Sequence, residues 1–372
     1  MNNTESTQPV TVLQRIASVD FFRGLTMFLL VGEGSRLYRI MQNSDNNVLA
    51  FIGTQFSHHR WNGLHFWDLI QPFFMFIVGV AIPFAVANRI KKGDSSSKIT
   101  RHAFKRAFLL LLFGTWLSWL GQGLIVFRFQ NVLAQLAVTY IIAFLIMKKS
   151  YNFQIIFSIV LLLLVDIAYR LFPVEGFNNP WVAYENLGAW VNNKIEGVDK
   201  ASIWASLNAL PTTAHTIWGV LCGKLIMSDR TSKEKIKIFL IAGITGLIIG
   251  YSLDFLNVTP IIKKIATMSF VFASGGWAIL ALCFSYWLID VKGKFLNGAK
   301  IFMYVGANSI FIYLFCQLGG DDILIKVFNP ISKTFFSWGG ETLVNILNGL
   351  AMWFGAWYIC YWMYKNRIFI KL

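Results

Sequence analysis

The 372-residue chain has few charged residues, few cysteines and a marked deficit of acidic side chains. Only 14% of its residues are Asp, Glu, Lys or Arg, against roughly 25% in a typical soluble domain. Because 56% of the residues are apolar, the composition excludes an ordinary soluble fold and predicts an all-α, polytopic integral membrane protein. The net charge of +15 is attributed to orientation in the membrane, so no nucleic acid partner is expected.

Several common motifs are also missing. The four cysteines lie in apolar segments without CxxC or Cys/His spacing, so neither a disulfide framework nor a zinc site is expected. The sequence contains no HExxH pattern, so a metal site of that kind is not expected either. The absence of GxxxxGK[ST] and GxGxxG argues against ATP-driven transport by this chain alone. The polar first seventeen residues predict no cleavable signal peptide.

Apolar runs long enough to cross a bilayer, about 20 residues each, recur along the chain. We predict ten spans, near 20–40, 68–88, 107–126, 131–147, 153–172, 209–227, 236–253, 265–289, 301–318 and 342–364. Most of the 33 basic residues fall at the termini and near 89–106, 148–149, 224–237 and 292–300. By the positive-inside rule these segments, and both termini, are cytoplasmic.

This topology predicts three parts. A cytoplasmic segment covers 1–19, a transmembrane domain covers 20–364, and a cytoplasmic tail covers 365–372. The long extracytoplasmic loop lies near 173–208.

The most informative polar cluster is HHRWNGL, residues 58–64, at the mouth of the second predicted span. Three of the five histidines lie within eight residues, and Asp68 follows His58 by ten. A histidine titrates near neutral pH, and a carboxylate beside it fixes its tautomer, so the pair is typical of a general base. A headgroup-bound interfacial histidine is the structural alternative.

The first predicted span carries Glu33 and Arg36 between glycines in its outer half. A carboxylate at that depth is costly unless it is paired or solvated. Two interpretations stay open: Glu33 pairs locally with Arg36, or it lines an outer cavity with His58 and Asp68.

Five strings in order resemble the heparan-α-glucosaminide N-acetyltransferase family, and its bacterial branch of NagX-type proteins in particular. They are SVDFFRGLTMF, HHRWNGLHFWDLIQPFFMFIVGV, RFQNVLAQLAVTY, PIIKKIATMSFVFASGGWAILALCFSYWLID and GANSIFIYLF. The resemblance implies a fold of antiparallel membrane helices. It also implies transfer of an acetyl group from cytosolic acetyl-CoA to the amino group of a glucosamine on the far side.

Carried over by motif, the resemblance implies that the catalytic histidine is His58 and not His59, with Asp68 as the carboxylate that begins span two. Glu33 stands near the position of an Asn implicated in lysosomal members. We expect His58 to be the base or an acetylated intermediate, Asp68 to orient it, and Glu33 to hold the sugar. Trp61 would offer an aromatic face and Asn62 a donor and an acceptor.

Other polar residues are candidates for contact with acetyl-CoA. Asp20 and Arg23 flank the cytoplasmic start of span one, where capping is the alternative. His215 and Asn308 fall inside spans six and nine, where helix-packing hydrogen bonds are the alternative.

The sequence therefore predicts a multi-pass acetyltransferase of the bacterial inner membrane. We expect acetyl-CoA as cosubstrate, a small amino sugar as acceptor, membrane lipid as a further partner, and no metal; a homodimer is left open. The lumenal domain of lysosomal members is missing from the sequence, which favours a small sugar over a polymer. The rivals are an amino-sugar transporter without chemistry and an O-acyltransferase of the same superfamily.

Overall fold

The computed structural model describes residues 16–196 and 202–370, and in these ranges the chain is helical with no β-strand. The α-helices are α1 (Ala17–Gly32), α2 (Leu37–Gln42), α3 (Asn47–Gln55), α4 (Ile70–Lys91), α5 (Ser96–Gln122), α6 (Val132–Ile146), α7 (Tyr151–Arg170), α8 (Leu187–Glu196), α9 (Ala209–Met227), α10 (Ser232–Phe255), α11 (Met268–Ser285), α12 (Leu296–Ala307), α13 (Ser309–Gln317), α14 (Gly320–Phe336) and α15 (Gly340–Lys365). Short 3₁₀ helices are η1 (Glu33–Ser35), η2 (Phe66–Leu69), η3 (Ser206–Asn208), η4 (Lys263–Ile265) and η6 (Ser337–Gly339); the π-helical η5 (Tyr286–Val291) extends α11.

Six helical segments of the described chain are long and apolar enough to cross a membrane. They are η2 with α4, α5, α7, α10, α11 with η5, and α14 with α15. Counting the pair α12 and α13, bent by 62°, as one span gives seven. The prediction of an all-helical membrane protein is confirmed, whereas ten spans and cytoplasmic termini remain predictions. Three predicted spans are missing from these seven: α1 and α6 have only 16 and 15 residues, and the 19 residues of α9 include His215, Lys224 and three threonines, which make it less apolar.

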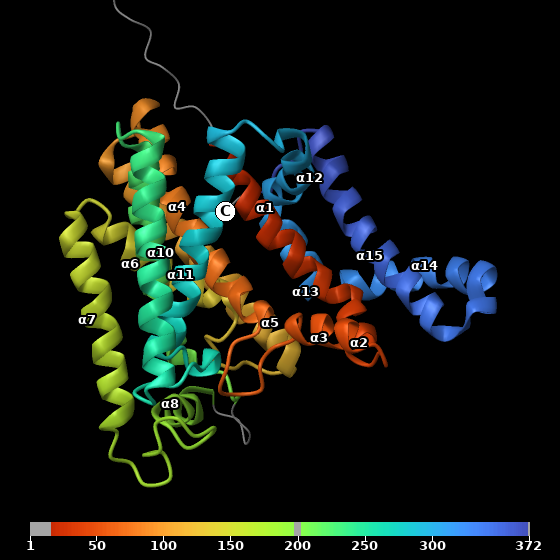
Figure 1. The fold of residues 1–372 in the computed structure, drawn as a ribbon, viewed down its shortest axis with the longest axis horizontal. Helices are drawn as coiled ribbons and strands as arrows, with labels where there is room; N and C mark the ends of the chain where they lie inside the picture. Colours follow the sequence, from red (N-terminus) through yellow and green to blue (C-terminus); the bar gives the residue numbers. More distant parts are fainter. Residues whose placement is uncertain (1–15, 197–201, 371–372) are drawn as a thin grey trace, which may run out of the picture.

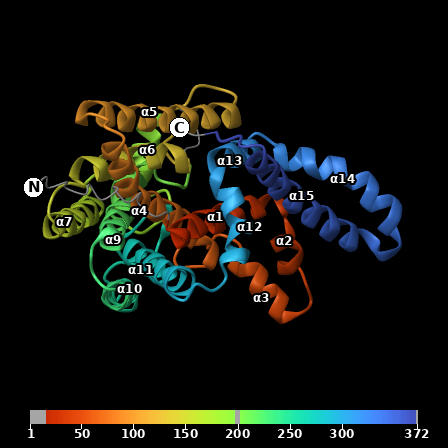
Figure 2. The same ribbon diagram turned by 90° about the horizontal axis from the view of Figure 1, so that it is seen from above.

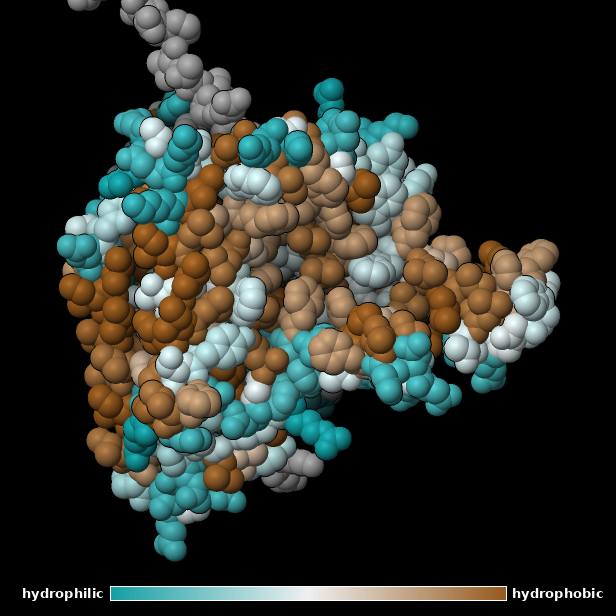
Figure 3. All heavy atoms as spheres, in the orientation of Figure 1, coloured by the Kyte–Doolittle hydropathy of each residue, from teal (hydrophilic) through white to brown (hydrophobic). Residues whose placement is uncertain are grey.

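The helices form one large bundle in which α7, α10 and α11 run in nearly the same direction and α1 and α15 cross them obliquely, while α14 and part of α15 project as an arm (Figures 1 and 2). The space-filling view shows a broad hydrophobic belt with hydrophilic residues above and below it (Figure 3). Exposed apolar side chains of α5, α7 and α10 form part of the lipid-facing surface, whereas α4 is mostly buried at the centre. This distribution is the one that a polytopic membrane protein requires.

Short polar residues begin several long helices. The side chains of Ser95, Asn131 and Ser150 each accept a hydrogen bond from a backbone N–H in the first turn of α5, α6 and α7. Thr231 begins α10 in the same way, and Glu234 returns the contact. These caps satisfy N–H groups that have no partner within the helix, so they place the turns between spans.

The centre of the bundle depends on close contact between α4 and α9. A Cβ atom on Gly79 would lie 2.1 Å from the Thr216 carbonyl oxygen, and one on Gly219 would lie 2.1 Å from the Phe76 carbonyl oxygen. Small residues allow membrane helices to approach at backbone distance, which increases their packing energy. The two helices therefore form a rigid central pair.

We expect Gly219→Ala to lower the thermal stability of the detergent-solubilised protein, because the new methyl group forces α4 and α9 apart. Overpacking of this kind costs about 1–3 kcal/mol. The matched control is Gly121→Ala in α5, where nothing lies within 4 Å of the added Cβ. If the melting temperature fell by the same amount in both variants, the close approach of α4 and α9 would be unimportant for stability.

One end of the bundle, the one predicted to be extracytoplasmic, is covered by the segment that follows α7. The predicted loop 173–208 contains α8 and η3, and residues 197–201 lie outside the described part. Leu187, Ala205, Ile262 and Ile265 form a small apolar cluster with Tyr169. The loop is thus a folded cover and not an extended linker.

The arm was not foreseen. The sequence assigned no helix to 319–341, where α14 packs against α15. Its apolar residues Ile323, Val327, Ile331 and Phe335 recur every fourth position and are exposed. A one-sided stripe of this kind is amphipathic and is missed by a search for continuous apolar runs.

Cysteines introduced at exposed positions test the predicted orientation. An impermeant thiol reagent added to intact cells should label Asn178→Cys in the cover and should not label Ser96→Cys at the start of α5, because the basic segment 89–106 is expected in the cytoplasm. Both side chains are exposed in the structure, so each introduced cysteine is accessible to a reagent on its own side of the membrane. The reverse labelling pattern would contradict the topology.

Candidate active site

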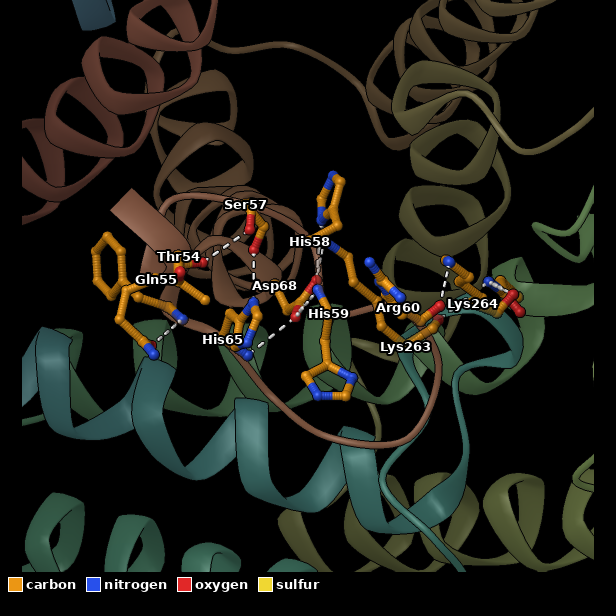
Figure 4. Close-up of polar contacts among 12 residues, drawn as sticks. Thr54, Gln55, Ser57, His58, His59, Arg60, His65, Asp68, Lys263 and Lys264 are labelled. Atoms are coloured by element: carbon orange, nitrogen blue, oxygen red, sulfur yellow. Dashed lines mark hydrogen bonds and ion pairs between the residues drawn. The ribbon is translucent and has the colours of Figure 1, made fainter. Parts of the chain in front are cut away.

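The candidate active site forms where residues 56–65, between α3 and η2, fold back against η4. The His58 Nδ1 atom lies 2.9 Å from Asp68 Oδ1. Asp68 is in η2, immediately before α4, and its side chain is 1% exposed. The sequence prediction that these two residues lie together agrees with their positions (Figure 4).

The carboxylate of Asp68, in η2, holds the loop 56–65 in place through several contacts. Its Oδ2 atom accepts hydrogen bonds from the backbone N–H groups of His59 (3.1 Å) and His65 (3.0 Å). Its Oδ1 atom contacts the imidazole of His58 and, at 3.5 Å, the ammonium of Lys263. A carboxylate with so many donors is held rigidly and stabilised in its charged form.

Gly63 allows the loop to turn back. Its φ of +138° is a conformation that L side chains rarely adopt, and a Cβ there would lie 2.6 Å from the His59 ring. The Gly63 N–H donates to the Ile261 carbonyl oxygen over 2.8 Å. This bond joins the histidine loop to the segment before α11.

The two adjacent histidines point to opposite sides of the loop (Figure 4). His58 lines a cavity, and its ring meets the edge of Trp204 with centroids 5.2 Å apart. His59 instead packs beside His65, 4.8 Å between ring centroids. Of the two, only His58 is placed to meet a ligand in the cavity.

Lys263, in η4, is a site residue that the sequence analysis missed. Its Nζ atom lies 3.2 Å from His58 Nδ1, its side chain is 7% exposed, and it sits 5.6 Å from the centre of the Trp204 ring. Burial lowers the pKa of Lys263 to about 8, although Asp68 opposes this effect. The ion pair with Asp68 keeps the buried ammonium charged near neutral pH.

The surroundings also favour a neutral His58. Burial lowers the pKa of its imidazole below the usual value, the hydrogen bond to Asp68 opposes this, and the positive charge of Lys263 lowers the pKa further. A neutral imidazole with one nitrogen held by a carboxylate leaves the other nitrogen free to accept a proton.

The cavity has a volume of about 350 Å³ and receives residues from widely separated elements. Its apolar wall is Leu30, Trp67, Ile70, Phe74 and Val132. Its polar wall is Glu33, His58, Gln71, Ser118, Arg128, Gln130, Asn131, Lys263, Tyr313 and Gln317, together with Trp204. A concave pocket in which polar groups converge opposite an apolar wall can bind a small polar molecule.

Glu33 faces this cavity and makes no ion pair or hydrogen bond among the described residues through its carboxylate. Arg36, the partner considered from the sequence, instead pairs with Asp322 of α14. The backbone of Arg36 adopts a left-handed conformation with φ +58°, which ends η1. Of the two interpretations left open by the sequence, the local pair of Glu33 with Arg36 is therefore not formed.

A buried ion pair between Arg128 and Glu196 stabilises another part of the cavity wall. Arg128 donates to Glu196 through Nε (3.1 Å) and a terminal nitrogen (2.6 Å), and Gln130 also donates to this carboxylate. Glu196, at the end of α8, has no exposed side-chain surface. The cover over the site is thereby attached to the segment that leads into α6.

Trp61 and Asn62 do not line the cavity. The Trp61 indole donates to the Trp181 carbonyl oxygen over 2.7 Å and packs in the cover, and Asn62 is exposed on the loop. Trp204 presents the aromatic ring to the cavity instead. The roles of Trp61 and Asn62 remain predictions without a contact at the site.

The four residues considered for acetyl-CoA also lie elsewhere. Asp20 and Arg23 form a 3.0 Å ion pair near the other end of α1. His215 is fully buried, with Nε2 2.9 Å from Ser274 Oγ. Asn308, at the break between α12 and α13, donates to the Ile368 carbonyl oxygen and accepts from the Ile370 N–H.

None of these four lines the cavity at His58, and their roles stay predictions. A second cavity of about 370 Å³ lies among α4, α5 and the end of α6, and no predicted site residue lines it either. No group of three or more metal ligands occurs in the described residues.

Comparison with known proteins gives distant relatives over almost the whole chain. The mouse heparan-alpha-glucosaminide N-acetyltransferase is 24% identical over 441 aligned positions, covering 96% of this chain and 60% of its own length. The human protein of the same name is 22% identical with the same coverage. No family model matches the chain. This chain, which spans 60% of the length of these relatives, is thus distantly similar, over nearly all of its own length, to two heparan-alpha-glucosaminide N-acetyltransferases.

Proposed function

We propose that this protein is a transmembrane acetyltransferase that moves the acetyl group of acetyl-CoA to the amino group of a small amino sugar. The observation that carries the proposal is the His58 and Asp68 pair, which opens onto a cavity that also holds Glu33. The similarity to two N-acetyltransferases supports the reaction class. A cavity of about 350 Å³, at the lower end for small-molecule sites, favours a single sugar.

In the proposed reaction, the bound sugar ammonium first loses a proton to solvent, and the neutral amine nitrogen then attacks the thioester carbonyl carbon. The new C–N bond forms while the C–S bond breaks, and CoA leaves as the thiolate. His58 accepts the proton that the nitrogen loses and returns it to the sulfur, so charge and atoms balance. Asp68 holds Nδ1–H of His58, which leaves Nε2 as the base.

The cavity walls suit the two substrates. Glu33 would pair with the sugar ammonium or its hydroxyl groups, and Trp204 would stack on the apolar face of the ring. Leu30, Ile70 and Phe74 would contact the acetyl end of acetyl-CoA. We further propose a bacterial inner-membrane location and cytoplasmic entry of acetyl-CoA, because basic residues gather on the predicted cytoplasmic side.

Purified protein incubated with acetyl-CoA and glucosamine tests this function. We expect free CoA and N-acetylglucosamine in equal amounts, and no product with glucose, which has no amine. Product that is lost on treatment with alkaline hydroxylamine would be an ester and would favour an O-acyltransferase. Binding of glucosamine without any acetylation would favour the transporter.

Glu33→Gln should weaken the apparent affinity for the amino sugar about ten- to a hundredfold, while the KM for acetyl-CoA barely changes. The variant keeps the shape and removes the charge, and a charge-assisted hydrogen bond is worth about 1.5–3 kcal/mol. Arg36→Gln is the control, because it breaks the pair with Asp322 on the neighbouring surface without changing the cavity. An unchanged sugar KM in Glu33→Gln would exclude direct contact.

A further inference from the structure

Lys263 is unusual because its buried ammonium lies against the proposed base itself. It is within 3.2 Å of His58 Nδ1 and 3.5 Å of Asp68 Oδ1. A buried lysine is costly unless it is paired, and Asp68 is the nearest carboxylate. The other titratable groups around this cluster are Glu33, His59, His65 and Lys264.

The geometry restricts the hydrogen bonds that His58 can make. An ammonium group donates and never accepts, so it can face Nδ1 only when that nitrogen carries no proton. When Nδ1 is protonated it donates to Asp68, and Lys263 then contacts the same carboxylate oxygen. In both arrangements a second proton on His58 would place an imidazolium directly beside the ammonium.

We propose that Lys263 is a positioning residue for the proposed acetyl transfer, which keeps His58 neutral by sharing the Asp68 carboxylate with it. Asp68 alone would stabilise an imidazolium, as a buried carboxylate beside a histidine commonly does. With the ammonium present, the carboxylate charge is already balanced, so Asp68 orients the ring without protonating it. The inference rests on the proposed function for its purpose, but the protonation of His58 is measurable without any turnover.

Lys264 supplies a matched control. It is the next residue, carries the same charge and lies 5.7 Å from the centre of the Trp204 ring, close to the 5.6 Å of Lys263. Its ammonium, however, donates to the Arg60 carbonyl oxygen, away from the contact between His58 and Asp68 (Figure 4). Removing its charge should therefore affect His58 much less.

The test is the rate at which diethyl pyrocarbonate modifies each histidine of the full-length protein between pH 5 and 8, followed by peptide mass spectrometry. The reagent attacks neutral imidazole, so the rate at His58 reports its protonation. In the wild type we expect half-maximal reactivity of His58 below pH 6.5. Lys263→Met should raise that midpoint by at least about one pH unit and slow modification at pH 6 at least about threefold.

Lys263→Arg should keep the wild-type midpoint, and so should Lys264→Met. Lys263→Gln, which is neutral but still donates hydrogen bonds, gives the same readout should the methionine variant fail to fold. A midpoint that stays unchanged or falls in the folded neutral variant would overturn the proposal. Because the assay needs no acetyl-CoA, its result is independent of whether acetyl transfer occurs.

Discussion

Replacing His58 by alanine should lower the rate of acetyl transfer by about 10²–10⁴-fold, the usual cost of losing a general base. Binding of acetyl-CoA should be nearly unchanged, because the imidazole acts on the sugar amine. The His58 ring is partly exposed to the cavity, so its removal should leave the fold intact. Initial rates and CoA affinity measured on the same preparation give both quantities.

His59→Ala is the matched control, because its ring points to the other side of the loop and packs beside His65. We expect a loss of less than about tenfold from this variant. If His59 proved essential and His58 dispensable, the assignment of the base to the first histidine of the loop would be wrong.

Asp68→Asn should have the largest combined effect on rate and stability. The amide oxygen can still accept the two backbone hydrogen bonds of His59 and His65, but the buried Lys263 ammonium is left without its carboxylate. Removing one partner of a buried ion pair typically costs about 3–5 kcal/mol. The rate should also fall about 10²–10⁴-fold, since the amide can hold His58 in the wrong tautomer.

The double variant Asp68→Asn with Lys263→Met separates the two effects. It removes both buried charges, so we expect it to recover much of the lost melting temperature without recovering activity. Equal stability of Asp68→Asn and the wild type would contradict a buried ion pair at this position. Recovery of activity in the double variant would show that Asp68 does not orient the base.

The part of the site that the sequence revealed is local. His58 and Asp68 are ten residues apart and belong to one loop at a helix start, so their proximity follows from the chain itself. Glu33 could be placed only as one of two alternatives, because its surroundings depend on α14, which brings Asp322 to Arg36. Because α14 is amphipathic, it lies outside the continuous apolar runs used to predict the spans. The sequence therefore did not indicate the ion pair between Arg36 and Asp322.

Lys263 and Trp204 could not be assigned because they reach His58 from 205 and 146 residues away in the chain. Lys263 stands beside Lys264 in PIIKK, and the sequence does not say which of the two is buried. The 3₁₀ turn of η4 determines which lysine is buried at the site, because it directs Lys263 towards Asp68 and Lys264 towards the Arg60 carbonyl.

The position of Trp61 outside the cavity has a similar cause. A tryptophan three residues after the base was expected to face the same cavity, but the turn at Gly63 directs the chain towards Ile261. The cover formed by α8 and its flanking segments then offers the Trp61 indole a carbonyl partner at Trp181. Folding of the distant cover, rather than local spacing, determines the direction of this ring.

We propose that acetyl groups pass from acetyl-CoA on one side of the membrane to an amino sugar on the other through the site at His58. Inverted membrane vesicles loaded with glucosamine, and given radiolabelled acetyl-CoA outside, test it directly. We expect labelled N-acetylglucosamine inside vesicles that carry the wild type, and at most trace amounts with His58→Ala. Efflux of unmodified glucosamine regardless of acetyl-CoA, with no labelled product in the lumen, would contradict it.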